Sequence, residues 1–191
     1  KLHLLNTTAD SENARKMLKT ALQTGNLYKI GLAVHSFADT FAHQNFVGYY
    51  DEFNIVKSLQ KKVNSFFDRS VYAVGHAAAN IRPDIPNLIW EDPRLCDSNC
   101  RRDNKEIFLK AAGRVFAELK SYQDPALKAA DLKKEKEELL SDLGAAIGRR
   151  TKHPEIFKIN TPAKRIERFR KLSLKKEYGS QKLKKYNISA W

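Results

Sequence analysis

The chain has 191 residues, of which 42% are hydrophobic, and only 8 glycines and 6 prolines, a composition typical of one globular domain rather than of a low-complexity protein. No run of about eighteen apolar residues occurs, so the sequence predicts no transmembrane helix. The net charge of +13 is uneven: residues 149–191 carry +11 and the other 148 residues carry +2. We therefore expect a helical domain over residues 1–148 and a basic, helical C-terminal extension over 149–191, packed on the same domain.

Apolar residues recur at helical spacing along most of the chain. Gly25 is a typical helix stop, Asn26 can cap the next helix, and the Asp124–Pro125 pair can begin a later one. The pattern predicts helices over residues 11–23, 27–44, 54–67, 104–119, 124–147, 161–174 and 180–187. No alternating strand pattern competes, so the predicted fold class is all-α, a multi-helix bundle.

Residues 70–100 have a different character. Residues 71–79 are apolar and rich in small side chains, which predicts a tightly packed helix or turn. Pro83 and Pro86 flank Asp84, and two prolines restrict the backbone strongly. We expect an ordered loop that presents the Asp84 carboxylate rigidly.

The two cysteines, Cys96 and Cys100, are separated by three residues, so they do not form a CxxC redox motif. A small disulfide loop is one interpretation, which would suit an exported protein, and two reduced thiols in a cytosolic protein are the other. The pair leaves both a bacterial periplasmic or secreted location and a cytoplasmic location open.

Three metal-ligating side chains lie in the predicted helix over 27–44. His35, Asp39 and His43 are spaced four residues apart, which places two imidazoles and a carboxylate on one helical face. These are ligand types for zinc and similar divalent metals. Burying three such groups without partners would cost roughly 1–3 kcal/mol each, which a bound metal would remove. A hydrogen-bonded structural network, or a row of surface residues, is the alternative interpretation.

Two further residues, His76 and Asp84, extend this candidate site. With an open coordination position, zinc would lower the pKa of a bound water toward ~7, and a second metal would clamp the oxygens of a phosphodiester. The predicted metal ligands are therefore His35, Asp39, His43, His76 and Asp84, with Asp39 and Asp84 also as catalytic carboxylates. Taken singly, His76 is equally compatible with a core histidine and Asp84 with a turn cap.

The pattern HxxxDTxxHxxF over residues 35–46 and the pattern GHx6PDxP over residues 75–86 resemble an uncharacterised bacterial all-helical family. That family is similar to the superfamily of zinc-dependent phospholipase C and the fungal single-strand-specific nucleases. The resemblance implies the zinc-dependent phospholipase C fold, a zinc site and hydrolysis of phosphate esters. It carries His35 and Asp39 over to the HxxxD element of the superfamily; a second HxxxE or HxxxD element is not found.

Three functions are therefore weighed. The first is a zinc-dependent hydrolase of a phospholipid or of a nucleic-acid phosphodiester, with a phosphate-containing anionic substrate. The second is a non-catalytic helical module with a structural metal. The third is a metal-free binder of nucleic acid or an anionic membrane surface through residues 149–191.

Overall fold

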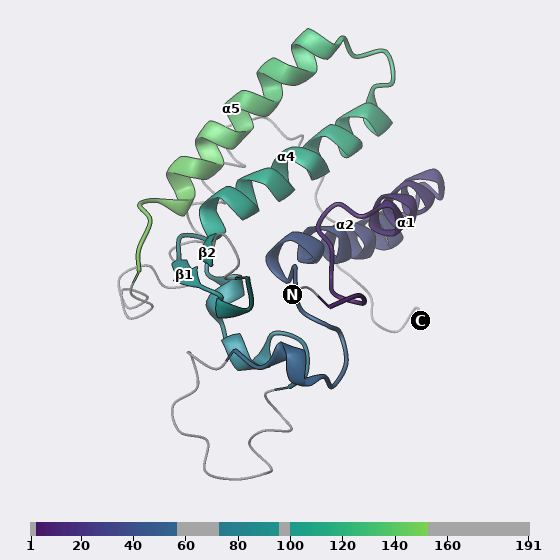
Figure 1. The fold of residues 1–191 in the computed structure, drawn as a ribbon. Helices are drawn as coiled ribbons and strands as arrows, with labels where there is room; N and C mark the ends of the chain where they lie inside the picture. The colour runs from purple at the N-terminus through teal and green to yellow at the C-terminus, as the bar shows by residue number, and fades with distance from the viewer. Residues whose placement is uncertain (1–2, 57–72, 96–99, 153–191) are drawn as a thin grey trace, which may run out of the picture.

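The computed structural model describes residues 3–56, 73–95 and 100–152, and this part of the chain is mostly helical (Figure 1). Its longer elements are α1 (Glu12–Gln23), α2 (Leu27–Ala42), β1 (Ile89–Glu91), β2 (Arg101–Asp103), α4 (Asn104–Gln123) and α5 (Ala129–Ile147). Short 3-10 helices span Glu52–Asn54, Ala77–Ala79, Arg82–Asp84 and Pro93–Leu95. Within the ranges described, none of the helices has the length and apolar character needed to cross a bilayer.

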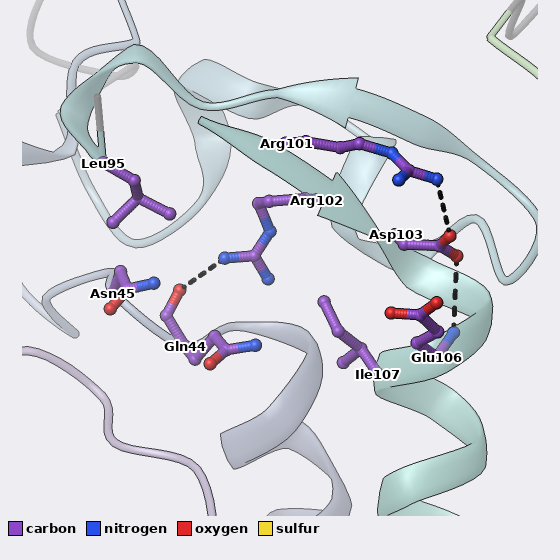
Figure 2. A pocket seen from close by; sticks show the side chains of 8 residues that line it. All are labelled: Gln44, Asn45, Leu95, Arg101, Arg102, Asp103, Glu106 and Ile107. Atoms are coloured by element: carbon purple, nitrogen blue, oxygen red, sulfur yellow. Dashed lines mark hydrogen bonds and ion pairs between the residues drawn. The ribbon is translucent and has the colours of Figure 1, made fainter. Parts of the chain in front are cut away.

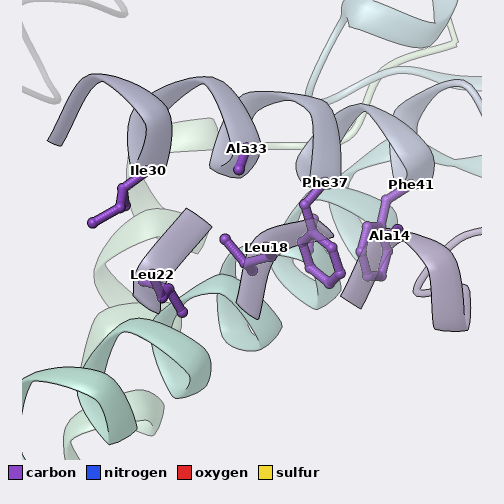
Figure 3. Packing of buried hydrophobic residues seen from close by; sticks show 8 residues of the cluster. Ala14, Leu18, Leu22, Ile30, Ala33, Phe37 and Phe41 are labelled. Atoms are coloured by element: carbon purple, nitrogen blue, oxygen red, sulfur yellow. The ribbon is translucent and has the colours of Figure 1, made fainter. Parts of the chain in front are cut away.

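The helices α1 and α2, both predicted from the sequence, pack against each other as a hairpin. Ser11 accepts a hydrogen bond from the Ala14 amide and begins α1, and Asn26 accepts bonds from the amides of Tyr28 and Lys29 and begins α2. The two helices face each other through a shared apolar stripe (Figure 3). Its buried members are Ala14, Leu18, Leu22, Ile30, Ala33, Phe37 and Phe41, joined by Ala111 of α4.

The helix α4 lies between α5 and the α1–α2 hairpin, so it packs against elements on both sides (Figure 1). It extends to Gln123, beyond the predicted end at residue 119. The helix α5 begins at Ala129 rather than at the expected Asp124–Pro125 pair. The reason is local: the Asp124 side chain accepts a bond from the Ala126 amide and its carbonyl accepts one from Leu127, so this pair forms a separate turn.

A small antiparallel sheet, not predicted from the sequence, joins β1 to β2. Trp90 pairs with Arg102, at the centre of the register. Cys100, which precedes β2, is disulfide-bonded, while Cys96 lies outside the described residues. Trp90 of β1 also belongs to a second apolar cluster, formed by Phe46, Val56, Ala78, Ala79, Ile85, Leu88 and Trp90. The general expectation of a helical protein is thus confirmed, with a short sheet added to it.

Several predicted segments lie outside the described residues, namely most of the helix over 54–67 and both basic helices after residue 153. The first residues of the predicted extension are described. Thr151 exchanges backbone hydrogen bonds with the segment before and at the start of β1: its carbonyl accepts from Ile89, and its amide donates to the Asn87 carbonyl. The division into a domain over 1–148 and an extension over 149–191 stays a prediction.

Candidate metal site

His43 lies directly after the last residue of α2. Its backbone amide donates to the Asp39 carbonyl at 2.9 Å, but its own backbone (φ −100°, ψ 18°) departs from the helix. The chain then turns at Asn45, whose φ of 69° is left-handed, a conformation that asparagine tolerates better than most residues. The end of α2 therefore places the His43 imidazole beyond the helix, toward residues 76 and 84.

His76 is held by a tight turn. Gly75 before it has a φ of 52°, which glycine adopts without steric cost. The His76 Nδ1 atom lies 3.1 Å from the Asn80 carbonyl oxygen. Since a carbonyl only accepts, Nδ1 carries a proton, and in the neutral imidazole this leaves Nε2 as the nitrogen that can bind a metal. This is the arrangement by which backbone carbonyls orient metal-binding histidines.

The same turn contains backbone strain. Asn80, a non-glycine residue, has φ 54° and ψ −140°, a combination that normally belongs to glycine. Its side-chain oxygen accepts a short bond of 2.7 Å from the Ile81 amide, which partly offsets the cost. The strained residue thus supplies the carbonyl that orients His76.

Asp84 ends the short 3-10 helix Arg82–Asp84, with the buried Pro83 before it. The Asp84 amide donates to the Ile81 carbonyl at 3.1 Å, which closes the turn. Asp84 therefore lies in a closed turn next to Pro83, while a rigid presentation of its carboxylate stays a prediction.

The three side chains converge. His43 Nε2 lies 2.9 Å from one oxygen of Asp84, and His76 Nε2 lies 4.0 Å from the other. The two imidazoles stack, with centroids 4.3 Å apart and planes inclined by 14°. One ligand atom from each of the three residues lies within 4.8 Å of the others, so the group could hold a metal ion. Tetrahedral zinc with ligands at about 2.0 Å would need ligand-atom separations of about 3.3 Å, so His76 Nε2 and the Asp84 oxygen 4.0 Å from it would have to move closer together.

The charge on Asp84 is favoured by this environment. The hydrogen bond from His43 is the main cause that lowers the pKa of the Asp84 carboxyl, and the nearby His76 and His43 lower it further. Partial burial opposes this effect. Asp84 is therefore ionised at neutral pH, as a metal ligand must be.

The other two predicted ligands form a separate pair on α2. His35 Nε2 lies 3.4 Å from Asp39 Oδ2, and 77% of the His35 side chain is exposed. Asp39 and Asp84 both line one pocket between α2 and α4, with a volume of about 420 Å³. Apart from these two carboxylates the lining is apolar, made of Val34, Ala38, Phe41, Ala42, Ile107, Phe108, Ala111, Ala112 and Val115. One member of each group, Asp39 and Asp84, therefore lines this pocket, whereas His35, His43 and His76 are not among its lining residues.

Three buried polar residues that the sequence reasoning did not single out bond to chain segments near the three-residue group. Asn54, Arg102 and Asn104 are at most 3% exposed, and their side chains bond mainly to backbone groups. Burial lowers the pKa of Arg102 to about 10, which leaves it charged at neutral pH. The sequence holds one local signal for this region. Asp103, between Arg102 and Asn104, has the spacing of a helix-capping box with Glu106, and its side chain does accept from the Glu106 amide at the start of α4 (Figure 2).

A family model described as a family of unknown function, DUF6765, matches residues 2–191. The chain belongs to this family. No curated protein and no solved structure matches it. The expectation of an uncharacterised family is consistent with this result, whereas the wider resemblance to the phospholipase C and nuclease superfamily gains no support from it.

Proposed function

We propose that the chain is a metal-dependent hydrolase of phosphate esters in which His43, His76 and Asp84 hold a divalent cation, most naturally zinc. The observation that carries this proposal is the convergence of these three side chains, which come from three separate segments, within 4.8 Å. Two histidines and one carboxylate form a common donor set of catalytic zinc sites, which keep a further position for water or substrate.

The chemistry follows from the donor set. A bound divalent ion lowers the pKa of a coordinated water toward about 7 and polarises a phosphoryl oxygen. Two neutral imidazoles and one carboxylate leave such a centre with net positive charge, which favours a phosphate anion. His76, with its proton on Nδ1, offers Nε2 to the cation. We assign to Asp39, in the wall of the same pocket, the role of accepting a proton from the water.

The lining of the pocket bears on the choice between a phospholipid and a nucleic acid as the proposed substrate. Its lining is apolar except for Asp39 and Asp84, and it presents no basic side chain. A nucleic acid is recognised through phosphate contacts by cations and through base stacking on aromatic rings. An apolar wall instead suits an ester whose alcohol carries an alkyl or acyl chain. This supports a lipid-like phosphate ester, while a role of residues 149–191 in attracting anionic surfaces stays a prediction.

The first test is metal content, measured by inductively coupled plasma mass spectrometry after purification without chelators. We expect near-stoichiometric zinc in the wild type and its loss in His43→Ala. His35→Ala is the matched control, because His35 is largely exposed and lies outside the three-residue group. Retention of metal in His43→Ala would contradict the assignment.

The second test is turnover. The wild type should hydrolyse a phosphodiester with an alkyl chain, and Asp39→Asn should lose most of this activity while keeping its metal. A metal-loaded wild type that hydrolyses none of a panel of alkyl, acylglycerol and nucleotide phosphodiesters would favour a structural metal instead. That alternative has one observation in its favour, since the three ligands join segments that are mostly irregular.

A further inference from the structure

Two buried polar residues at the junction of β2 and α4 bond to backbone on either side of the proposed metal ligands. Arg102 and Asn104 are 3% and 1% exposed. Arg102 donates from Nη2 to the Ala42 carbonyl at 3.0 Å and from Nη1 to the Gln44 carbonyl at 3.1 Å (Figure 2 shows the second). These two carbonyls flank His43 in the chain.

Asn104 makes the equivalent contacts around Asp84. Its side-chain amide donates to the Arg82 carbonyl at 2.6 Å and to the Ile85 carbonyl at 2.8 Å, with the Pro83 carbonyl at 3.5 Å. Every acceptor of this amide therefore lies within two residues of Asp84.

Trp90 of β1 joins the two polar residues into one unit. Its indole N–H donates to the Asn104 side-chain oxygen at 3.1 Å, and the Arg102 guanidinium lies 5.2 Å from the centre of its ring. The strand pairing of Trp90 with Arg102 fixes this arrangement from the backbone as well.

We infer that Arg102 and Asn104 are positioning residues, which hold the backbone at His43 and at Asp84 so that the two ligands meet at metal-binding distance. This inference rests on the proposed metal role of the three-residue group. His43 and Asp84 are 41 residues apart, and His43 follows a helix end whose carbonyls lack intrahelical donors. Because Arg102 and Asn104 are separated by one residue, the short β2–α4 junction sets the distance between the two ligand segments.

A planar guanidinium is needed for this role at residue 102. Its fork reaches the two carbonyls at once from fixed directions, whereas a lysine ammonium is a single point of charge on a flexible stem. The substitution Arg102→Lys therefore keeps the charge and removes the double contact. An effect on metal binding would then report the lost geometry rather than the lost charge.

The test compares Arg102→Lys with the matched control Arg114→Lys. Arg114 lies on α4 and pairs with Asp10 and Glu118, neither of which belongs to a ligand segment. Zinc affinity is measured by competition with a chromogenic chelator, and coordination geometry by the visible spectrum of the cobalt(II)-loaded protein. Circular dichroism in chelator confirms that each variant is folded.

We expect Arg102→Lys to weaken zinc binding by about 10- to 100-fold and to alter the cobalt spectrum, and Arg114→Lys to change neither. If Arg102→Lys loses stability but keeps the wild-type affinity and spectrum, the residue is only structural and the inference is wrong. If the wild type itself takes up no zinc or cobalt, the proposed function fails, and the inference fails with it. Asn104→Ser, which removes the amide donors, is the second variant and should weaken binding in the same direction.

Discussion

The substitution Asn54→Asp tests how far one buried side chain organises the segments around the site. Asn54 is fully buried, and its amide nitrogen donates to the carbonyls of Val47, Tyr49 and Ala73 at 2.9 to 3.0 Å. Its oxygen accepts from the Val47 amide at 2.8 Å. The substitution keeps the shape and this last bond, but it points an oxygen at three carbonyls.

The cost can be worked from these contacts. Three carbonyls, two of them in buried contacts, lose the two N–H donors that they share, at roughly 1–3 kcal/mol for each lost donor, and a carboxylate without a cation partner adds a desolvation cost. We therefore expect the free energy of unfolding to fall by about 3–5 kcal/mol near neutral pH, a large part of the stability of an ordinary domain. Urea denaturation followed by far-ultraviolet circular dichroism in chelator measures it.

The loss should depend on pH with a defined sign. The buried site raises the pKa of the introduced carboxyl above its unfolded value, so protonation favours the folded state. The stability deficit is therefore largest above the raised pKa and shrinks as the pH falls toward about 4, where the protonated carboxyl supplies one donor again. A deficit that is the same at pH values of about 7 and 5 would refute the reasoning.

Asn26→Asp is the matched control. Asn26 caps α2 through its side-chain oxygen alone, and a carboxylate retains that role and suits the helix N-terminus. We expect a change within about 0.5 kcal/mol. Equal effects of the two substitutions would show that the contacts of Asn54 do not carry the predicted energy.

Three further predictions concern α1 and α2, each measured by urea denaturation. Phe37→Ala should cost about 3–5 kcal/mol, because Phe37 is fully buried and meets Phe41 edge-on at 5.6 Å; a loss below about 1 kcal/mol would contradict the packing. Gly31→Ala should raise the free energy of unfolding by about 0.5–1 kcal/mol, since alanine favours the helix and an added Cβ meets no atom within 4 Å; a lower free energy of unfolding would show that the added methyl group does clash with a neighbour. Ser11→Ala should cost about 1 kcal/mol through the lost cap of α1, and an unchanged midpoint would argue that the cap is not formed in solution.

Local signals in the sequence predicted the helices α1 and α2 well, because the stop at Gly25, the cap at Asn26 and the apolar residues at helical spacing all agree with one another. The β1–β2 sheet had no such signal. Each strand is three residues long, and β2 consists of Arg101, Arg102 and Asp103, which have no apolar alternation. Next to the paired residues, the Asp92 amide donates to the Cys100 carbonyl, a contact that no residue pattern in either strand indicates. Short charged strands of this kind cannot be found from periodicity.

At the candidate site, helical spacing predicted only part of the arrangement of the side chains. The i, i+4, i+8 row assumes a continuous helix, and the contact between His35 and Asp39 follows from it. The helix ends at Ala42, so the His43 side chain does not continue the helical face that carries His35 and Asp39. It instead contacts Asp84, 41 residues further along the chain. We infer that the positioning residues Arg102 and Asn104 bring Asp84 to His43. Their role can be recognised only when the carbonyls that accept their hydrogen bonds are known. The sequence therefore indicates which residue types could bind a metal. Which of them come together depends, in our proposal, on buried polar side chains that bond to backbone and follow no sequence period.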